Sequence, residues 1–371
     1  MSIWLNFLID SLAFGATFMY GSTGEIITEK GGQLNLGIPG VMCMGGAGGC
    51  LVLNMIGKSS LPAFMIVVLG ILGSLAMGTL MGLIYSFLTV SLRANQNVTG
   101  LALTTFGVGL MKVIMSEMDE TVYLVGPKQL YRWPFAGRTD AFQYLGVMFF
   151  MGVIIAIAAS YVLYRTKIGL HLRAVGESPA TADAMGVNVS RYKYGASCIG
   201  CGIAGLGGFY YIIDYMASTE AYKSLEGLGW LSVALVIFAL WRPHMTIIGS
   251  TIFGFLFSCS SYISNISWIN VTMATKPLLK MLPYLVTILV LIFTSIRKKR
   301  DQDDQEIIVH HRRQLADGQL AQRGRAAGHP DHQKIADDVD GHIIHHQRKE
   351  RFVGIPFCLA NSGKHRPNRT A

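Results

Sequence analysis

Residues 165–195 read RTKIGLHLRAVGESPATADAMGVNVSRYKYG, a hydrophilic stretch that separates two long apolar runs. Both of its ends are basic: the first carries Arg165 and Lys167, and the second carries Arg191 and Lys193. Loops rich in lysine and arginine stay on the cytoplasmic side of a membrane. The stretch therefore predicts a long cytoplasmic loop, and its length and patterning indicate a docking surface for another molecule.

The middle of this loop predicts a short helix over residues 178–185. Ser178 is a favourable N-cap. Pro179 suits the first helical position because proline has no N–H, and an N–H at that position would have no partner within the helix. Gly186 follows as a favourable C-terminal stop. Such a helix, lying parallel to the membrane, could transmit force from a soluble partner. A surface helix without a partner would show the same signals.

The composition of the chain is that of a membrane protein with a polar extension. Of the 371 residues, 51% are hydrophobic and 14% are charged, whereas soluble domains typically carry about 25% charged residues. Lys and Arg number 16 in residues 1–296 and 15 in residues 297–371. We therefore expect an all-α, polytopic transmembrane bundle over residues 1–300 and a polar extension over residues 301–371. The basic charge is interpreted as membrane orientation, with no nucleic acid as partner.

Apolar runs of about 20 residues, the length that crosses a bilayer, occur nine times, and we expect eight to ten spans. The runs cover residues 4–22, 37–56, 62–90, 98–115, 142–164, 195–215, 228–241, 246–263 and 281–296.

The basic clusters agree on the orientation of these spans. Arg297 to Arg300 read RKKR directly after the last run, which predicts a cytoplasmic C-terminal side. Counting back four runs places the loop at 165–193 on the same side, and counting back two more places Arg93 there. The N-terminus is then expected outside.

Small residues are frequent in the runs. Gly78-x-x-x-Gly82 and the stretch from Ala204 to Gly208 have the spacing that lets helices approach closely in lipid. Cys198-x-x-Cys201 has metal or redox spacing but lacks a second pair, so these cysteines are interpreted as small packing residues. We expect no metal site.

Two polar segments are candidates for lining a solute pathway. Residues 24–40 read GEIITEKGGQLNLGIPG, in which Gln33 and Asn35 offer uncharged hydrogen-bonding groups. An interfacial turn that caps two helices explains this segment equally well. The second segment, NQNVTG at 95–100, leads into the fourth run. Asn97 and Thr99 either cap the helix expected there or face the pathway, and Thr104 continues this polar segment into the run.

The remaining charged groups do not suggest catalysis. Asp10 and Asp214 lie near the ends of apolar runs, which predicts interfacial placement rather than a proton site. Trp241-Arg242-Pro243 predicts a tight cytoplasmic turn, with Arg242 as a determinant of orientation. The sequence lacks a G-x-x-x-x-G-K-[ST] phosphate loop, so we expect no nucleotide hydrolysis by this chain and no enzymatic activity.

Three motifs over residues 1–300 resemble the permease subunits of ATP-binding-cassette importers, in the simple sugar and nucleoside branch of the branched-chain amino acid and ribose permease family. They are GEIITEKGGQLNLGIPG at 24–40, TKIGLHLRAVGESPATADAMGVNV at 166–189 and LEGLGWLSVALVIFALWRP at 225–243. The chain departs from the family pattern at Pro39, where the family often has Glu, and at Leu228, where it has Arg.

The resemblance implies a mechanism and a set of partners. An extracytoplasmic binding protein would deliver a nucleoside or simple sugar to this chain and a paralogous permease subunit, surrounded by lipid in a bacterial cytoplasmic membrane. Cytoplasmic ATP-binding subunits would hold ATP and magnesium, so this chain itself needs no cofactor. The implied coupling residues are Glu177, Ser178, Pro179, Ala180, Thr181, Ala182, Asp183, Ala184, Met185 and Gly186.

Three alternatives stay open. The first is a stand-alone secondary transporter or facilitator for a small polar solute, which would need no partner chain. The second is the permease of a branched-chain amino acid importer. The third is a polytopic membrane enzyme, against which the missing catalytic groups weigh.

The extension at 301–371 is rich in Gln, Asp, Arg and His and has no apolar periodicity, which predicts disorder. It has no counterpart in the resembled family, and a shifted reading frame or an unrelated extension would explain it. We therefore expect deletion of residues 303–371 to leave solute uptake intact. Loss of uptake in cells expressing the truncated chain at normal levels would contradict this expectation.

Overall fold

The structure is a computed structural model that describes residues 3–56, 61–118, 145–218 and 220–263, with single positions between 281 and 296. Contacts divide the chain into Met1–Leu285 and Val286–Ala371, and the fold below concerns the first unit. The loop at 119–144, most of the predicted run at 281–296 and the extension at 301–371 lie outside the described residues. The predicted boundary at residue 300 and the predicted disorder beyond it stay predictions.

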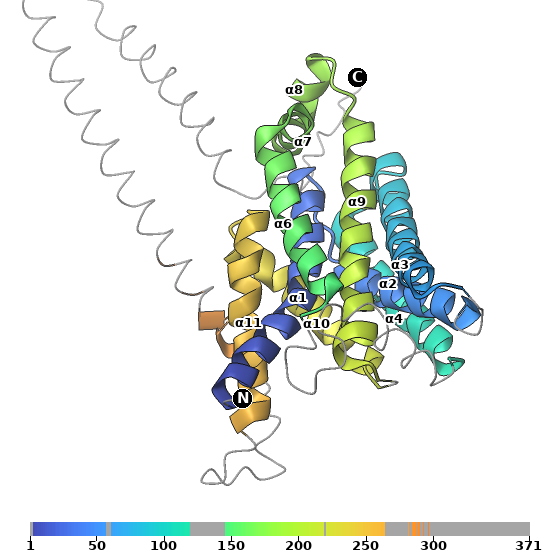
Figure 1. The fold of residues 1–371 in the computed structure, drawn as a ribbon. Coiled ribbons are helices and arrows are strands. Elements are labelled where there is room, and N and C mark those ends of the chain that lie inside the picture. Colours follow the sequence, from blue (N-terminus) through green and yellow to red (C-terminus); the bar gives the residue numbers. More distant parts are fainter. Residues whose placement is uncertain are drawn as a thin grey trace, which may run out of the picture. The chain divides into compact units, whose positions relative to one another are not determined.

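Every regular element in the described ranges is a helix, which confirms the all-α prediction (Figure 1). The elements are α1 Ile3–Lys30, α2 Ile38–Ile56, α3 Ala63–Ser86, η1 Phe87–Ser91, α4 Gln96–Ser116, α6 Val147–Arg165, α7 Lys167–Glu177, α8 Pro179–Ala184, α9 Val189–Phe209, η4 Tyr210–Met216, α10 Tyr222–Phe238 and α11 Pro243–Ile263.

Five segments of this bundle are long and apolar enough to cross a membrane. They are Ile38–Ile56, Phe64–Ser91, Gln96–Ser116, Val147–Arg165 and Val189–Met216. Each coincides with a predicted run, so the chain is a multi-pass helical membrane protein. The expectation of eight to ten spans goes beyond these five and stays a prediction.

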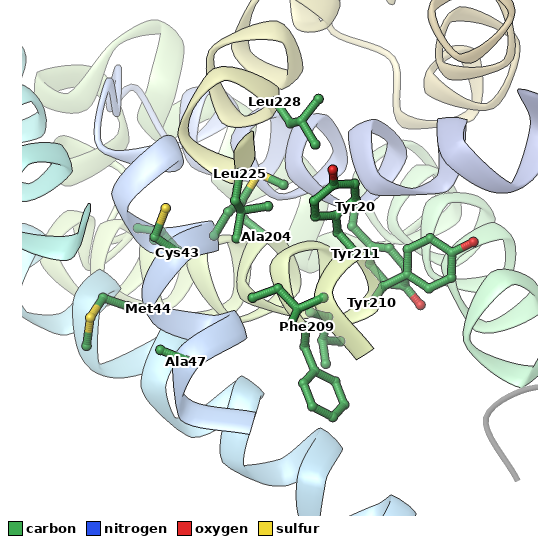
Figure 2. Packing of buried hydrophobic residues seen from close by; sticks show 14 of the residues in the cluster. Tyr20, Cys43, Met44, Ala47, Ala204, Phe209, Tyr210, Tyr211, Leu225 and Leu228 are labelled. Carbon is green, nitrogen blue, oxygen red and sulfur yellow. The ribbon is translucent and has the colours of Figure 1, made fainter. Parts of the chain in front are cut away.

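The core of the bundle lies around α9 and α2. Helix α9 packs against α1, α2 and α3, and its span is far more buried than that of α6, which faces outward. Figure 2 shows part of this core: Tyr20 of α1, Cys43 of α2, Phe209 of α9 and Leu228 of α10 come together with their neighbours. The many small residues of α9 allow its neighbours to approach closely.

Glycines set the distances between the central helices. A Cβ on Gly78 would lie 2.5 Å from the carbonyl oxygen of Cys201, and one on Gly82 would lie 2.5 Å from that of Ser197. A Cβ on Gly205 would lie 3.2 Å from the Cα atoms of both Gly45 and Gly78. The helices therefore meet backbone to backbone, as expected where lipid provides no hydrophobic driving force between helices.

Two helices end in π-helical turns that the sequence did not predict. In η4, Asp214 is only 1% exposed, so this carboxylate is buried in the protein. Its placement at the membrane interface stays a prediction. Bonding from i to i+5 changes which residues share a face, so a 3.6-residue period does not assign faces within η4. Asp10 is half-buried and accepts a hydrogen bond from the Tyr215 hydroxyl at 2.9 Å.

The N-cap of α4 also differs from the prediction. Asn95, not Asn97 or Thr99, caps the helix: its Oδ1 accepts from the backbone N–H groups of Asn97 at 3.0 Å and Val98 at 3.3 Å. Asparagine is a preferred capping residue, and residues 95–97 read Asn-Gln-Asn. The sequence alone therefore does not decide which of the two asparagines caps the helix, and the backbone geometry selects Asn95.

We expect Gly78→Ala to destabilise the bundle by about 1–3 kcal/mol, the usual range for overpacking, because its Cβ would meet the Cys201 carbonyl. Gly109→Ala is the matched control, since a Cβ there meets nothing within 4 Å. Thermal unfolding of the purified chain in detergent measures both. Equal melting temperatures for the two variants would show that the close approach of α3 and α9 does not limit stability.

Candidate functional site

The predicted short helix in the long polar loop is confirmed as α8, Pro179–Ala184. Ser178 is its N-cap residue, with Pro179 in the first turn, and the Ser178 hydroxyl lies 2.7 Å from that of Thr181. Gly186 has φ +82°, a conformation that glycine adopts without strain. The sequence therefore located this helix to within one residue at each end.

Helix α7, Lys167–Glu177, precedes α8 and was missed. Its N-cap is Thr166, whose hydroxyl accepts from the Gly169 N–H at 3.2 Å. Leu172 and Val175 are buried, while Ile168 and Leu170 are exposed. A threonine cap followed by apolar residues on one side is a signal that could have identified α7.

The α8 segment stands out from the bundle. Figure 1 shows it at the far end of α7, beyond the end of α6. Ala182 anchors it as a buried residue, and Met185 just after it is 79% exposed. An apolar side chain that is this exposed within a polar segment is suited to contact with another protein. The other predicted coupling residues are exposed or half-buried: Glu177, Ser178, Pro179, Ala180, Thr181, Asp183, Ala184 and Gly186.

The end of α7 lies against a second segment, the loop at residues 31–37 between α1 and α2. Gly32 has φ +78°, and a Cβ there would lie 3.0 Å from the Cα of Gly176. A Cβ on Gly176 would in turn lie 3.1 Å from the Gly32 nitrogen. Two glycines therefore let the loop and the end of α7 touch through their backbones.

The two polar side chains of this loop are buried and bonded within the chain. The Gln33 amide donates to the Thr89 hydroxyl at 3.2 Å and accepts from the Ser197 hydroxyl at 2.7 Å. Asn35 donates from Nδ2 to the Cys201 sulfur at 3.3 Å, and its Oδ1 accepts from the Gly37 N–H at 2.9 Å. These bonds tie the loop to η1 and α9.

The backbone of the loop is paired as well. The Leu34 N–H donates to Gln96 Oε1 at 3.0 Å, and the Leu34 carbonyl accepts from the Tyr85 hydroxyl at 2.7 Å. The Leu36 carbonyl accepts from the Thr104 hydroxyl at 2.9 Å. The loop is thus held by α3 and α4 in addition to η1 and α9.

Three of the five predicted pathway residues lie in this loop or bond to it, namely Gln33, Asn35 and Thr104. Thr99 is buried in α4, whereas Asn97 is exposed in the first turn of the same helix. In this conformation Gln33, Asn35 and Thr104 bond to the protein itself, as the alternative of a capping turn requires. Their contact with a solute stays a prediction.

Two carboxylates of α1 complete the site. Glu25, fully buried, accepts the Asn35 N–H at 3.0 Å, and Glu29 accepts the indole N–H of Trp241. Trp241 has φ +55°, and the Arg242 N–H donates to the Ala239 carbonyl at 2.9 Å. The predicted turn at Trp241-Arg242-Pro243 is therefore present, and Trp241 links it to α1.

The chain resembles several known transport proteins over most of its length. It is 30% identical over 290 residues to the nucleoside ABC transporter permease protein NupC of Lactococcus lactis subsp. cremoris, covering 76% of this chain and 90% of NupC. It is 30% identical over 301 residues to the guanosine ABC transporter permease protein NupQ of Bacillus subtilis, covering 76% and 89%.

A third relative is TsgC13 of Haloferax volcanii, an ABC transporter permease protein provisionally named for glucose. The two chains are 30% identical over 320 residues, which is 80% of this chain and 94% of TsgC13. Residues 7–291 match the family described as "Branched-chain amino acid transport system / permease component". Because this match covers the α1–α2 loop, α7, α8 and the whole described bundle, the chain belongs to the family of branched-chain amino acid transport system permease components.

Proposed function

We propose that this chain is the permease subunit of an ATP-driven importer, with a nucleoside or simple sugar as its solute. The exposed α8 segment carries the proposal, because it offers a partner chain a short helix joined to the core of the bundle. The relatives NupC and NupQ are named for nucleoside and guanosine, and TsgC13 for glucose. These names favour the nucleoside and sugar class over branched-chain amino acids, although the family description names the latter.

In this proposal, α8 is the docking element for a cytoplasmic ATP-binding subunit. That subunit holds ATP and magnesium, and the permease holds neither. Met185, Ala180 and Ala184 expose small or apolar surface, and a buried methionine contributes about 1.5–3 kcal/mol when it leaves water. Such a contact is strong enough to position the subunit and weak enough to form and break in each transport cycle.

The loop at 31–37 then relays the motion of α8 into the bundle. A displacement of α8 moves α7, and the end of α7 presses on Gly32 through Gly176. Gln33 passes the motion to η1 and α9, and the Leu36 carbonyl passes it to α4 through Thr104. Elements far apart in sequence are thereby coupled to one docking site.

The predicted pathway residues acquire a second role in this scheme. Gln33 and Asn35 meet a solute only if their bonds to Ser197 and Cys201 break during the cycle. Such a change would accompany the alternation between inward and outward states. Thr99, which is buried in α4, would be uncovered with them.

The remaining parts of the assembly follow from the same mechanism. A paralogous permease subunit would complete the pathway, and an extracytoplasmic binding protein would deliver the solute. The chain would lie in a bacterial cytoplasmic membrane with α8 and the C-terminus on the cytoplasmic side. The competing function is a secondary transporter that works alone. It does not account for the exposed Met185, because such a transporter has no partner chain to contact this side chain.

We expect Met185→Asp to abolish co-purification of the ATP-binding subunit and to lower uptake at least tenfold, because a carboxylate cannot enter an apolar contact without a large desolvation cost. Met185→Leu, which conserves volume and apolarity, should retain both. Affinity purification of the assembled transporter and uptake of labelled nucleoside measure the two effects. Normal assembly of the Met185→Asp variant would show that α8 is not the docking element for the ATP-binding subunit.

We expect Gly32→Ala to lower uptake per ATP hydrolysed while leaving subunit assembly intact. An alanine at φ +78° costs about 1–2 kcal/mol, and its Cβ would crowd Gly176, so the relay would shift. Gly195→Ala is the matched control, because a Cβ there meets nothing within 4 Å. Unchanged coupling in Gly32→Ala, measured as uptake against ATP hydrolysis in vesicles, would rule out the loop as the relay.

A further inference from the structure

A cavity of about 430 Å³ opens between α6 and α11, near the end of α6 that leads into α7. Its polar lining consists of Ser160, Arg165, Arg242 and His244. The transport mechanism above uses none of these side chains. Figure 1 shows α6 and α11 next to each other on the outer side of the bundle, and the two helices are in contact.

Hydrogen bonds from α6 to α11 and to the turn before α11 shape this cavity. The Ser160 hydroxyl lies 2.9 Å from His244 Nδ1, and the Tyr164 hydroxyl donates to the Trp241 carbonyl at 3.2 Å. The Arg173 guanidinium of α7 lies over the Tyr164 ring, 5.2 Å from its centre. The cavity is therefore a built feature of the interface between α6, α7 and α11.

Two guanidinium groups at the cavity are available to a ligand. Arg165 and Arg242 are exposed, and neither forms a salt bridge with another described residue. The nearby carboxylate of Glu29 is already engaged by Trp241. Lys30 is within electrostatic reach of Arg173 and Arg242, and also of the carboxylates of Glu177 and Glu29, whereas the two arginines that line the cavity itself are Arg165 and Arg242. The site is thus cationic, and guanidinium groups bind phosphate oxygens through paired N–H donors.

The cavity lies where a lipid headgroup would be. The rest of its lining consists of Ile157, Tyr161 and Tyr164 of α6, and tyrosine is enriched at the level of headgroups. Exposed apolar residues continue from it along both helices, with Ile154 on α6 and Ile248 on α11. A molecule with an anionic head and apolar chains matches a cationic cavity that is followed by apolar helix faces.

We propose that this cavity binds the headgroup of an anionic phospholipid, whose phosphodiester lies between Arg165 and Arg242 and whose acyl chains follow the apolar faces of α6 and α11. A free phosphate would use the arginines but leave the apolar faces unused. An acidic protein segment would need to enter the lipid-facing side of α6. The proposal depends on the chain being a membrane protein and not on its solute or its energy source.

The test is a competition on the purified full chain in detergent, with phosphatidylglycerol and phosphatidylcholine of identical acyl chains. Native mass spectrometry counts the retained lipid. We expect wild-type protein to prefer phosphatidylglycerol, with a loss of roughly five-fold in this preference for Arg165→Gln or Arg242→Gln and roughly 25-fold for both. Arg191→Gln, an exposed arginine away from the cavity, should keep the full preference.

Two further measurements separate the possible occupants. Inorganic phosphate in millimolar excess should not displace the lipid, because it lacks the apolar part. In wild-type protein alone, added salt should weaken the preference for phosphatidylglycerol, which tests the site even if the double variant does not fold.

Four outcomes would overturn the proposal. Equal retention of the two lipids, or a full preference in the folded double variant, would show that the arginines do not select the headgroup. Displacement by inorganic phosphate would indicate a site for a free anion. Loss of the ATP-binding subunit from the double variant with unchanged lipid preference would make the cavity a protein contact.

Discussion

The polar backbone of the α1–α2 loop must be paired inside a helical bundle, and the structure around it is organised by this requirement. Buried amide groups without partners cost several kcal/mol in apolar surroundings. Leu34 and Leu36 therefore bond to Gln96, Tyr85 and Thr104, and Gln33 bonds to Ser197. These partners lie on α3, α4 and α9, so one short loop fixes the positions of these three helices at this end of the bundle.

The same requirement connects the loop to the proposed function. A loop whose bonds reach several helices transmits any displacement to all of them. The glycine contact between Gly32 and Gly176 brings α7 against this loop with no side chain between the two backbones. Backbone contacts of this kind also join α3 to α9 through Gly78 and Gly82, so in the proposed mechanism motion would pass between rigid bodies and would not be absorbed by flexible side chains.

Local signals were sufficient for some of these elements and not for others. Ser178, Pro179 and Gly186 located α8 because capping and φ preferences act within a few residues. The apolar runs located the spans because hydrophobic length is a local property. The partners of Gln33 could not be predicted, since Ser197 is 164 residues away in sequence. The π-helical turn that buries Asp214 was missed because nothing in its composition distinguishes it from an α-helix, and α7 was missed although Thr166 gave a capping signal.

The central claim is that transport by this chain depends on a partner acting through α8. Reconstitution in lipid vesicles tests it most directly, with nucleoside uptake measured for the chain alone and together with its permease partner, the ATP-binding subunits and the solute-binding protein. The account predicts uptake only in the complete assembly, and only with ATP. Uptake by the chain alone, driven by an ion gradient or by the solute gradient, would contradict it.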